Sequence, residues 1–403
     1  MDNSERAAEP KISNPAPLAG VRVLDLSWLL PGPFCTHVLV ELGAEVIKVE
    51  RPDGGDYLRE ILPAAYALVN RGKRSIAIDL KSESGRALLD ELLENTDVVV
   101  EGFRPGVAAR LEIDYATLSA RHPKIIYASI SGYGQTGPLA LLPGHDINYL
   151  ARGGALSIPA HWQEGPRRSG LPVGDLSASL YAVINILAAL LSRDTSGRGA
   201  HIDLSITESV LHWSQVRFAD HDEHAGEDWH HVRPGNDIFT TSDGQPIAIG
   251  LVEEKFWRNF GEASLWPEAP QIAHDFENAS SEVTRQQLGN RLRTELTQHI
   301  SQHDLAHWKR VLQAGDIPFS TVSGSEEVFS DPHFVARGVV SSITTQGGER
   351  IGSAALPGGL YAGSQTPAPV IDEHGPTIRA ELLEIAKRTR AGTSKQETCL
   401  AAT

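Results

Sequence analysis

The sequence predicts an α/β protein whose first half forms a parallel sheet and whose later part adds a smaller α+β domain. In the first half, short runs of apolar, often β-branched residues alternate with segments that suit helices. This alternation favours parallel strands, because each helix returns the chain to the same end of the sheet. Hydrophobic residues make up 41% of the 403 residues, a normal share for a globular protein with a core.

The first strand, the first helix and the second strand follow one another closely. Val21 to Leu26 has the apolar character of a buried strand, and the Pro-Gly-Pro turn at residues 31–33 breaks it. Phe34 to Leu42 suits a helix, which Gly43 is well placed to end. Glu45 to Glu50 then completes a β-α-β unit, which is the start of a parallel sheet.

The same rhythm continues along the chain to about residue 214. A Gly- and Pro-rich loop occupies residues 132–144, and a long apolar helix starts near Asp175 and ends before Ser196. Further strands are expected at residues 75–80, 97–101, 125–131 and 201–204, and further helices at residues 83–94, at 115–121 and from about 207. Near the end of the chain, a final helix is expected at residues 377–386.

Changes in composition divide the chain into domains and tails. Residues 1–17 and 389–403 are polar, and we expect both to be flexible tails. Residues 215–330 hold short strands followed by helices, which predicts the smaller α+β domain. The large domain takes the remainder, residues 18–214 and 331–388.

Composition excludes several classes of function. The formal net charge is -15, so the chain lacks the basic face that general nucleic-acid binding requires. The most apolar stretch, Tyr181 to Leu191, is too short to span a bilayer, and the polar start of the chain indicates no secretory signal. The two cysteines, Cys35 and Cys399, do not indicate a disulfide framework. We therefore expect a cytoplasmic protein that binds neither nucleic acid nor membrane.

Two segments invite a cofactor or metal interpretation but lack the spacing for it. Glu50 ends the second strand, where a dinucleotide-binding protein places its ribose-binding acid. The G-x-G-x-x-G turn is absent, however, and prolines stand where a phosphate loop needs free N–H groups. Residues 221–231 read HDEHAGEDWHH, but a rigid zinc spacing such as HExxH is missing. We therefore predict neither a nicotinamide or flavin cofactor nor a metal.

His145 and Asp175 are the candidate catalytic residues. His145 lies in the motif GHDINY, where Asp146 and Asn148 could orient the imidazole or bond the backbone. A packed or surface histidine is the equally open alternative. Asp175 stands at the start of the long apolar helix, where aspartate is a favoured N-cap. The same place also suits a base or a nucleophile, because the positive helix end can hold an oxyanion.

Basic residues cluster at three turns in the first half of the chain. Lys48 and Arg51 form the first cluster, Lys73 and Arg74 lie in the second, NRGKRS, and Arg104 lies in the third, EGFRPG. Charges beside turns are usually only solvated. At the strand ends of a parallel sheet they could instead converge at its carboxyl edge, where phosphates are their natural partners.

Several longer motifs carry a resemblance to a known family. They read GVRVLDLSWLLPGP, LGAEVIKVERPDGGD, NRGKRSIAIDLKS, VVVEGFRPG, SGYGQTGP and GDLSASLYAVINILAALLSRDTSGRGAHIDLSITES. In this order they resemble the CaiB/BaiF family of coenzyme A (CoA) enzymes, which contains the class III CoA-transferases and the α-methylacyl-CoA racemases. The similarity runs almost without gaps from about residue 18 to 210 and continues more weakly to about residue 360.

The resemblance implies a fold, a ligand and an assembly. It implies a large Rossmann-like domain built from both chain ends, a small domain, and two subunits interlocked as a homodimer. It implies an acyl-CoA thioester as substrate and no separate cofactor, because CoA is part of the substrate. By position, four residues match the family's CoA-contacting region, namely Arg51, Lys73, Arg74 and Arg104.

Two activities share this family's scaffold. In the transferases, the aspartate matching Asp175 is the nucleophile, which carries acyl groups as mixed anhydrides and CoA as a thioester. In the racemases, a histidine in GHDINY and an aspartate thirty residues later face each other across the substrate α-carbon, and His145 and Asp175 have this spacing. Glu253, in LVEEKFW, takes the position of a glutamate that pairs with that histidine.

On this resemblance we expect an α-methylacyl-CoA racemase that moves the α-proton of a 2-methylacyl-CoA through an enolate. His145 and Asp175 would be the acid and base, Glu253 would support the imidazole, and amide groups at the start of the Asp175 helix would hold the enolate oxygen. The alternative is a class III CoA-transferase with an aspartyl-CoA thioester on Asp175, which the transferase-like segment RRSGLPVGD favours. A second alternative is a non-catalytic CoA-binding protein.

Overall fold

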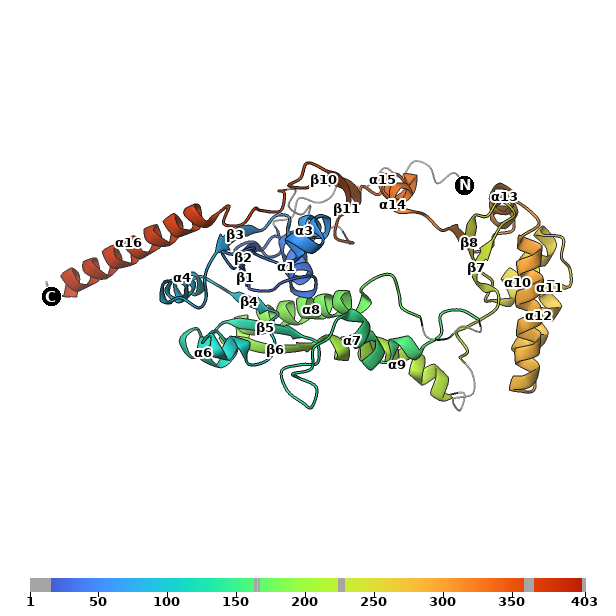
Figure 1. Cartoon of the computed structure of the whole chain (residues 1–403), viewed down its shortest axis with the longest axis horizontal. Coiled ribbons are helices and arrows are strands. Elements are labelled where there is room, and N and C mark those ends of the chain that lie inside the picture. The colour runs from blue at the N-terminus through green and yellow to red at the C-terminus, as the bar shows by residue number, and fades with distance from the viewer. Residues whose placement is uncertain (1–15, 163–164, 166, 224–228, 359–365, 401–403) are drawn as a thin grey trace. The chain divides into compact units, whose positions relative to one another are not determined.

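The computed structural model describes residues 16–162, 165, 167–223, 229–358 and 366–400, which fall into two compact units (Figure 1). The first unit contains the described residues of 1–150, 171–210 and 329–403, and the second contains those of 151–170 and 211–328. This division groups residues 151–170 with the second unit, whereas the sequence led us to place them in the large domain.

A six-stranded parallel sheet forms the centre of the first unit. Its strand order is β3-β2-β1-β4-β5-β6, so the order reverses between β1 and β4, where doubly wound sheets bind their ligands. The predicted α/β class with a parallel sheet is therefore confirmed. The strands are β1 (Arg22–Asp25), β2 (Glu45–Glu50), β3 (Arg74–Ala77), β4 (Val98–Glu101), β5 (Ile126–Ser131) and β6 (Ala200–Ser205).

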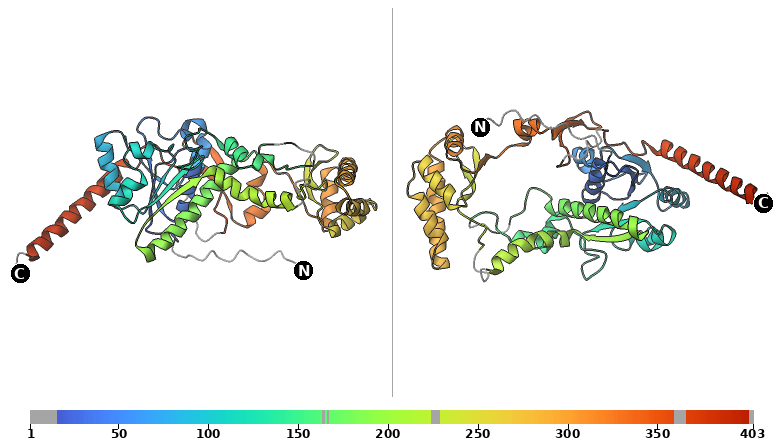
Figure 2. Two further views of the ribbon diagram at one scale, coloured as in Figure 1. Left: turned by 90° about the horizontal axis from the view of Figure 1, so that it is seen from below. Right: turned by 180° about the vertical axis from the view of Figure 1, so that it is seen from behind.

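Helices cover both faces of this sheet, which is why the central strand β4 is buried on both sides and does not alternate apolar with polar residues (Figure 2). In β4, Val98 and Val100 pack into a core with α1 and α8, while Val99 packs into a second core with α4, α6 and α16. The helices of this unit are α1 (Pro31–Glu41), α2 (Leu58–Ile61), α3 (Pro63–Asn70), α4 (Glu83–Leu93), α5 (Val107–Arg110), α6 (Tyr115–Arg121), α7 (Asp146–Arg152), α8 (Val173–Ser196) and the start of α9 (Ile206–Glu223).

The C-terminal segment returns to the first unit. It forms α15 (Pro332–Ala336) and an antiparallel pair, β10 (Val340–Thr344) with β11 (Arg350–Ala354). The last helix, α16 (Gly375–Leu400), docks on the sheet through Ile378 and Leu382. It continues well past Ala386, where we expected it to end, because the sequence beyond contains no proline and is rich in good helix formers.

The second unit is a three-stranded antiparallel sheet packed against four helices. Its strands follow the order β7-β8-β9, and its core includes Phe239, Ile247, Leu296 and Trp308. The elements are the 3-10 helix η1 (Ala155–Ser157), β7 (Asn236–Thr240), β8 (Pro246–Gly250), α10 (Glu254–Ala263), α11 (Ala269–Glu277), α12 (Glu282–Ile300), α13 (Leu305–Ala314), β9 (Phe319–Thr321) and α14 (Ser325–Val328).

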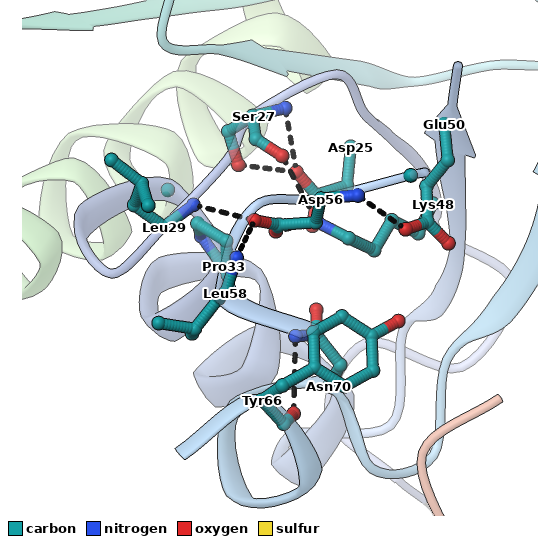
Figure 3. Close-up of polar contacts among 12 residues, drawn as sticks. Asp25, Ser27, Leu29, Pro33, Lys48, Glu50, Asp56, Leu58, Tyr66 and Asn70 are labelled. Carbon is teal, nitrogen blue, oxygen red and sulfur yellow. Dashed lines mark hydrogen bonds and ion pairs between the residues drawn. The ribbon is translucent and has the colours of Figure 1, made fainter. Parts of the chain in front are cut away.

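A network of buried charges lies beneath the loop that joins β1 to α1 (Figure 3). Lys73 bonds the Asp25 carboxylate at 2.9 Å, and Lys48 pairs with Asp56 at 2.9 Å. Arg59 pairs with Glu50 at 2.7 Å. Three acids thus balance three bases, which is the condition under which charges can be buried without a large desolvation penalty. Burial alone would raise the pKa of Asp25, but the ammonium groups of Lys73 and Lys48 hold it well below its ordinary value.

The same network fixes the β1–α1 loop at the point where the strand order reverses. Asp25 accepts a hydrogen bond from the Ser27 amide at 3.0 Å, and Lys48 donates to the Ser27 carbonyl oxygen at 3.0 Å. Asp56 accepts from the amide of Leu29 at 3.0 Å. Leu29 has a φ of 64°, a left-handed conformation that a leucine adopts only when its surroundings impose it. The buried ions therefore set the shape of a loop at the ligand-binding edge.

Neighbouring residues Lys73 and Arg74 provide a direct test of this network. Lys73→Ala leaves the buried Asp25 carboxylate short of a counter-charge and should cost about 3–5 kcal/mol of unfolding free energy. Arg74 pairs with the partly exposed Glu45 and Glu381, so Arg74→Ala should cost only about 0–1 kcal/mol. Urea unfolding of both variants measures the difference, and equal small losses would contradict the assigned role of the network.

Candidate active site

A cavity of about 270 Å³ lies at the carboxyl edge of the parallel sheet. Loops that follow β1, β4 and β5 form its walls, together with the starts of α7 and α8. This is the edge at which the strand order reverses, the expected place for a ligand in a doubly wound sheet. The lining side chains with polar groups include Trp28, Arg104, Ser131, His145, Asp146, Tyr149 and Asp175.

The cavity thus contains both candidate catalytic residues, His145 and Asp175. Asp175 is the third residue of α8, and its carboxylate makes no hydrogen bond or ion pair with the described part of the chain. Burial, followed by the negative charge of Asp146, raises the pKa of Asp175 to about 7. Its ionised form is therefore more basic than an ordinary carboxylate and a better nucleophile.

Asp146, and not Asp175, caps the start of α8. The helix begins at Val173, and Asp146 Oδ1 accepts from the amides of Gly174 at 2.8 Å and Asp175 at 3.2 Å. The interpretation of Asp175 as an N-cap is therefore wrong, and its side chain is left for chemistry. The sequence suggested that Asp146 could bond backbone, but it gave no sign that the bonded backbone would be that of Asp175.

The expected amide site for an enolate oxygen is also wrong. The first amides of α8 already have acceptors, because Val173 donates to the Leu171 carbonyl and Leu176 donates to the Pro172 carbonyl. The two amides between them donate to Asp146. The helix start therefore offers no unoccupied N–H group to an oxyanion within this described segment.

His145 is exposed, and its backbone is firmly held. Its amide donates to Asn148 Oδ1 at 3.0 Å, so Asn148 bonds backbone as the sequence suggested. The Tyr149 hydroxyl donates to the Gly144 carbonyl oxygen at 2.6 Å. The Tyr149 ring packs so closely that a Cβ at Gly132 or Gly144 would lie 2.4 or 2.7 Å from it, which explains the two glycines that bound this loop. Sequence reasoning did not single out Tyr149.

Two of the four predicted CoA-contacting residues lie at or beside this cavity. Arg104 lines it and makes no hydrogen bond or ion pair through its side chain with other described residues. The Arg51 guanidinium lies 4.3 Å from the ring centre of Tyr57 and 5.7 Å from that of Trp28, another lining residue. Both guanidinium groups are suitable partners for phosphate.

The structure does not place Lys73 and Arg74 where we expected them. The fully buried Lys73 ammonium donates to Asp25, to the Pro33 carbonyl oxygen and to Asn70, which uses all three of its protons. Arg74 is the first residue of β3 and so lies at the amino end of that strand, opposite the cavity. Their position beside a strand was visible in the sequence, but the direction of each side chain was not.

A larger hollow of about 1070 Å³ lies at the amino edge of the sheet. Its arginines already have acidic partners, because Arg22 pairs with Glu45 at 2.7 Å and Arg193 pairs with Asp97 at 2.9 Å. Its side chains include no buried carboxylate or nucleophile. The chemistry therefore belongs to the smaller cavity at the carboxyl edge.

Two further predicted features lie in the second unit. Glu253 is exposed at the start of α10, and its pairing with His145 stays a prediction. In the His- and Asp-rich segment, residues 224–228 fall outside the described residues, and the His221 ring stacks on Trp229 with 4.1 Å between ring centres. The described part of the chain contains no group of three metal-ligating side chains suited to a metal ion.

Comparison with known proteins identifies the relatives of this chain. Residues 18–379 match the family described as CoA-transferase family III. The acetyl-CoA:oxalate CoA-transferase of Acetobacter aceti is 32% identical over 93% of this chain and 97% of its own. The succinate–glutarate CoA-transferase of Agrobacterium fabrum is 33% identical over the same shares. The crystal structure of a CaiB/BaiF family protein from Brucella suis has a TM-score of 0.77 and 30% identity and covers 91% of this chain and 99% of its own.

These relatives confirm the CaiB/BaiF resemblance and correct the expected reaction. The similar curated proteins are named CoA-transferases, so the racemase prediction is wrong and the transferase alternative has the better support. The spacing of His145 and Asp175 did not distinguish the two activities. The transferase-like segment RRSGLPVGD before the aspartate was the more informative signal.

The raised pKa of Asp175 predicts how stability depends on pH. Its carboxyl has an ordinary pKa of 3.8 when unfolded and about 7 when folded, so ionising it in the folded state costs stability. That cost is absent below 3.8, grows as the pH rises towards 7, and is complete above it. Asp175→Asn removes the cost, and its gain in Tm over the unsubstituted protein should be larger at about pH 8 than at about pH 5.

Calorimetry at both pH values measures this gain. The matched control is Glu91→Gln, which neutralises an exposed carboxylate on α4 and should change Tm little at either pH. A gain for Asp175→Asn that is the same at both values, or larger at the lower one, would contradict the raised pKa.

Proposed function

Because this chain belongs to CoA-transferase family III, we propose that it moves CoA between two carboxylic acids, with Asp175 as the nucleophile. The observation that carries this proposal is the Asp175 carboxylate, which lines a cavity at the ligand-binding edge of the sheet and has no hydrogen-bond or ion-pair partner among the described residues. A carboxylate that is desolvated and unpaired is suited to attack a thioester.

The reaction needs only this carboxylate and the two substrates. Asp175 attacks the carbonyl carbon of the acyl-CoA, and the C–S bond breaks. CoA leaves as a thiolate, and the acyl group stays on Asp175 as a mixed anhydride. The thiolate then attacks the Asp175 carbonyl carbon and releases the first acid, which leaves CoA as a thioester on Asp175. The second acid repeats these steps in reverse order, so that a new acyl-CoA forms and the Asp175 carboxylate is restored.

Two arginines support binding of CoA at this edge. Arg104 lines the cavity, and the Arg51 guanidinium is held by a hydrogen bond to the Gly55 carbonyl oxygen at 3.0 Å and by the Tyr57 ring. One guanidinium group can donate to two phosphate oxygens at once. These residues are therefore suited to the diphosphate and ribose phosphate of CoA. Lys73 and Arg74 are left out of this proposal because their side chains are used elsewhere.

Short dicarboxylic acids are the substrates that we propose. The relatives are named for oxalate, succinate and glutarate, which all carry two carboxyl groups. The cavity of about 270 Å³ has room for a short acid. Arg104 and His145 line it and provide N–H groups for the carboxylate that does not react.

Mass spectrometry tests the proposed intermediate. Incubation with succinyl-CoA or acetyl-CoA alone should add CoA to the peptide that contains Asp175, and hydroxylamine should remove the adduct. The adduct should form faster as the pH rises through about 7, because the ionised Asp175 carboxylate is the group that attacks the acyl-CoA. Adding oxalate, succinate or glutarate should then discharge CoA to the added acid. Asp175→Asn should form no adduct. Tight CoA binding without transfer to any acid would instead leave a non-catalytic CoA-binding protein.

A homodimer is the second part of the proposal, because α8 presents apolar side chains that the first unit does not cover. Its length and apolar composition would suit a membrane helix, yet Ala178, Ala182 and Ile186 are buried against the sheet. On its outer side, Ile184 is 57% exposed and Leu191 is 74% exposed. A second copy of the chain is suited to cover this face.

Light scattering tests the assembly. The protein should have twice its chain mass of 43.6 kDa at micromolar concentration. Ile184→Asp should weaken the dimer, because a carboxylate would then be buried without a partner, whereas Glu91→Gln on α4 should not. A stable monomer of 43.6 kDa would contradict the proposal.

A further inference from the structure

Asp146 uses its two carboxylate oxygens in different ways. Oδ1 accepts the amides of Gly174 and Asp175 at 2.8 and 3.2 Å. Oδ2 is buried and has no hydrogen-bond partner among the described residues, although Asp146 as a whole is only 6% exposed. A buried carboxylate oxygen without a partner is uncommon, because its desolvation is not compensated. This atom therefore calls for an explanation.

The bonded oxygen explains where Asp175 is held. Pro172 occupies the N-cap position of α8 and has no side chain that could accept the first amides. Asp146 performs that role from α7, a separate helix, and it follows directly after His145 in the chain. A Cβ at Gly174 would lie 2.9 Å from Asp146 Oδ1, so the glycine allows this close approach. The position of Asp175 thus depends on Asp146.

The unpaired oxygen acts on Asp175 through its charge. The other titratable or charged side chains that line the cavity are Arg104, His145 and Tyr149, and Tyr133 packs against the Tyr149 ring. The Tyr149 hydroxyl donates to the Gly144 carbonyl oxygen. In the described part of the chain, none of these groups donates a hydrogen bond to either carboxylate. The repulsion between Asp146 and Asp175 is therefore not neutralised by a bonded partner.

We propose that Asp146 is the positioning residue of the nucleophile: it anchors the first turn of α8 and, by the charge it keeps unpaired, makes the Asp175 carboxylate a stronger nucleophile. This inference rests on the proposed transferase function and assigns to Asp146 a role that Asp175 alone does not explain. Repulsion from Asp146 disfavours the ionised form of Asp175. Attack on the thioester carbonyl relieves this repulsion, because the negative charge passes to the departing thiolate.

Asp146→Asn separates the two roles. Its amide oxygen can still accept the two amides of α8, but it carries no charge. The pKa of Asp175, raised to about 7 in the unsubstituted protein, should fall by about one unit or more in the variant. The rate of CoA transfer should then reach its plateau at lower pH, with a lower plateau because the carboxylate is less basic. Asp304→Asn is the matched control, since Asp304 caps α13 in the second unit.

Carboxyl-detected NMR of protein labelled with carbon-13 in aspartate measures the pKa without any need for activity. The Asp175 signal is the one that Asp175→Asn removes. A pKa that falls in Asp146→Asn and not in Asp304→Asn supports the proposal. An unchanged Asp175 pKa in a folded Asp146→Asn protein overturns it and leaves Asp146 as a helix cap only. If the chain transfers CoA to no acid, the proposed function fails, while this titration still decides the relation between the two carboxylates.

Discussion

The buried balance of charges beneath the β1–α1 loop is the constraint on which the site depends. Asp25, Lys48 and Asp56 form a chain of contacts that ends on the Ser27 carbonyl oxygen and the Leu29 amide. Buried ions tolerate little displacement, because each one left without its partner would carry the full desolvation penalty. The loop at the reversal of strand order is therefore held in one shape, and the cavity wall that it provides is fixed before any substrate binds.

A different electrostatic principle governs the cavity wall that α7 and α8 provide. There, Asp146 and Asp175 are like charges in a desolvated place, and Asp175 has no compensating cation bonded to it in the described chain. The fold therefore combines a fully compensated set of charges, which gives rigidity, with an uncompensated pair, which gives reactivity. The compensated charges stabilise the fold, and the repulsion between Asp146 and Asp175 removes part of that stability, as is common at catalytic sites.

The sequence predicted the fold well where local pattern decides it. The second strand was predicted as Glu45 to Glu50 and has those bounds, because Gly43 ends the preceding helix and the β-branched residues Val46, Ile47 and Val49 favour a strand. The direction of the Lys73 side chain could not be predicted. Nothing in the local sequence tells whether a lysine beside a strand points to solvent or to a carboxylate distant in the chain, such as Asp25. Asp146 and Asp175 were both noted, but their contact joins two helices and is visible only in three dimensions.

The central claim is that Asp175 exchanges an oxygen atom with the acids whose CoA it transfers. An acceptor acid labelled with heavy oxygen in its carboxylate should leave one labelled oxygen on Asp175 after a single turnover, because the bond between the acyl carbon and the bridging oxygen breaks in the last step. Mass spectrometry of the peptide that contains Asp175 measures this directly. We predict one heavy oxygen on that peptide in unlabelled water. Transfer of CoA to the labelled acid with no label on Asp175 would contradict the account.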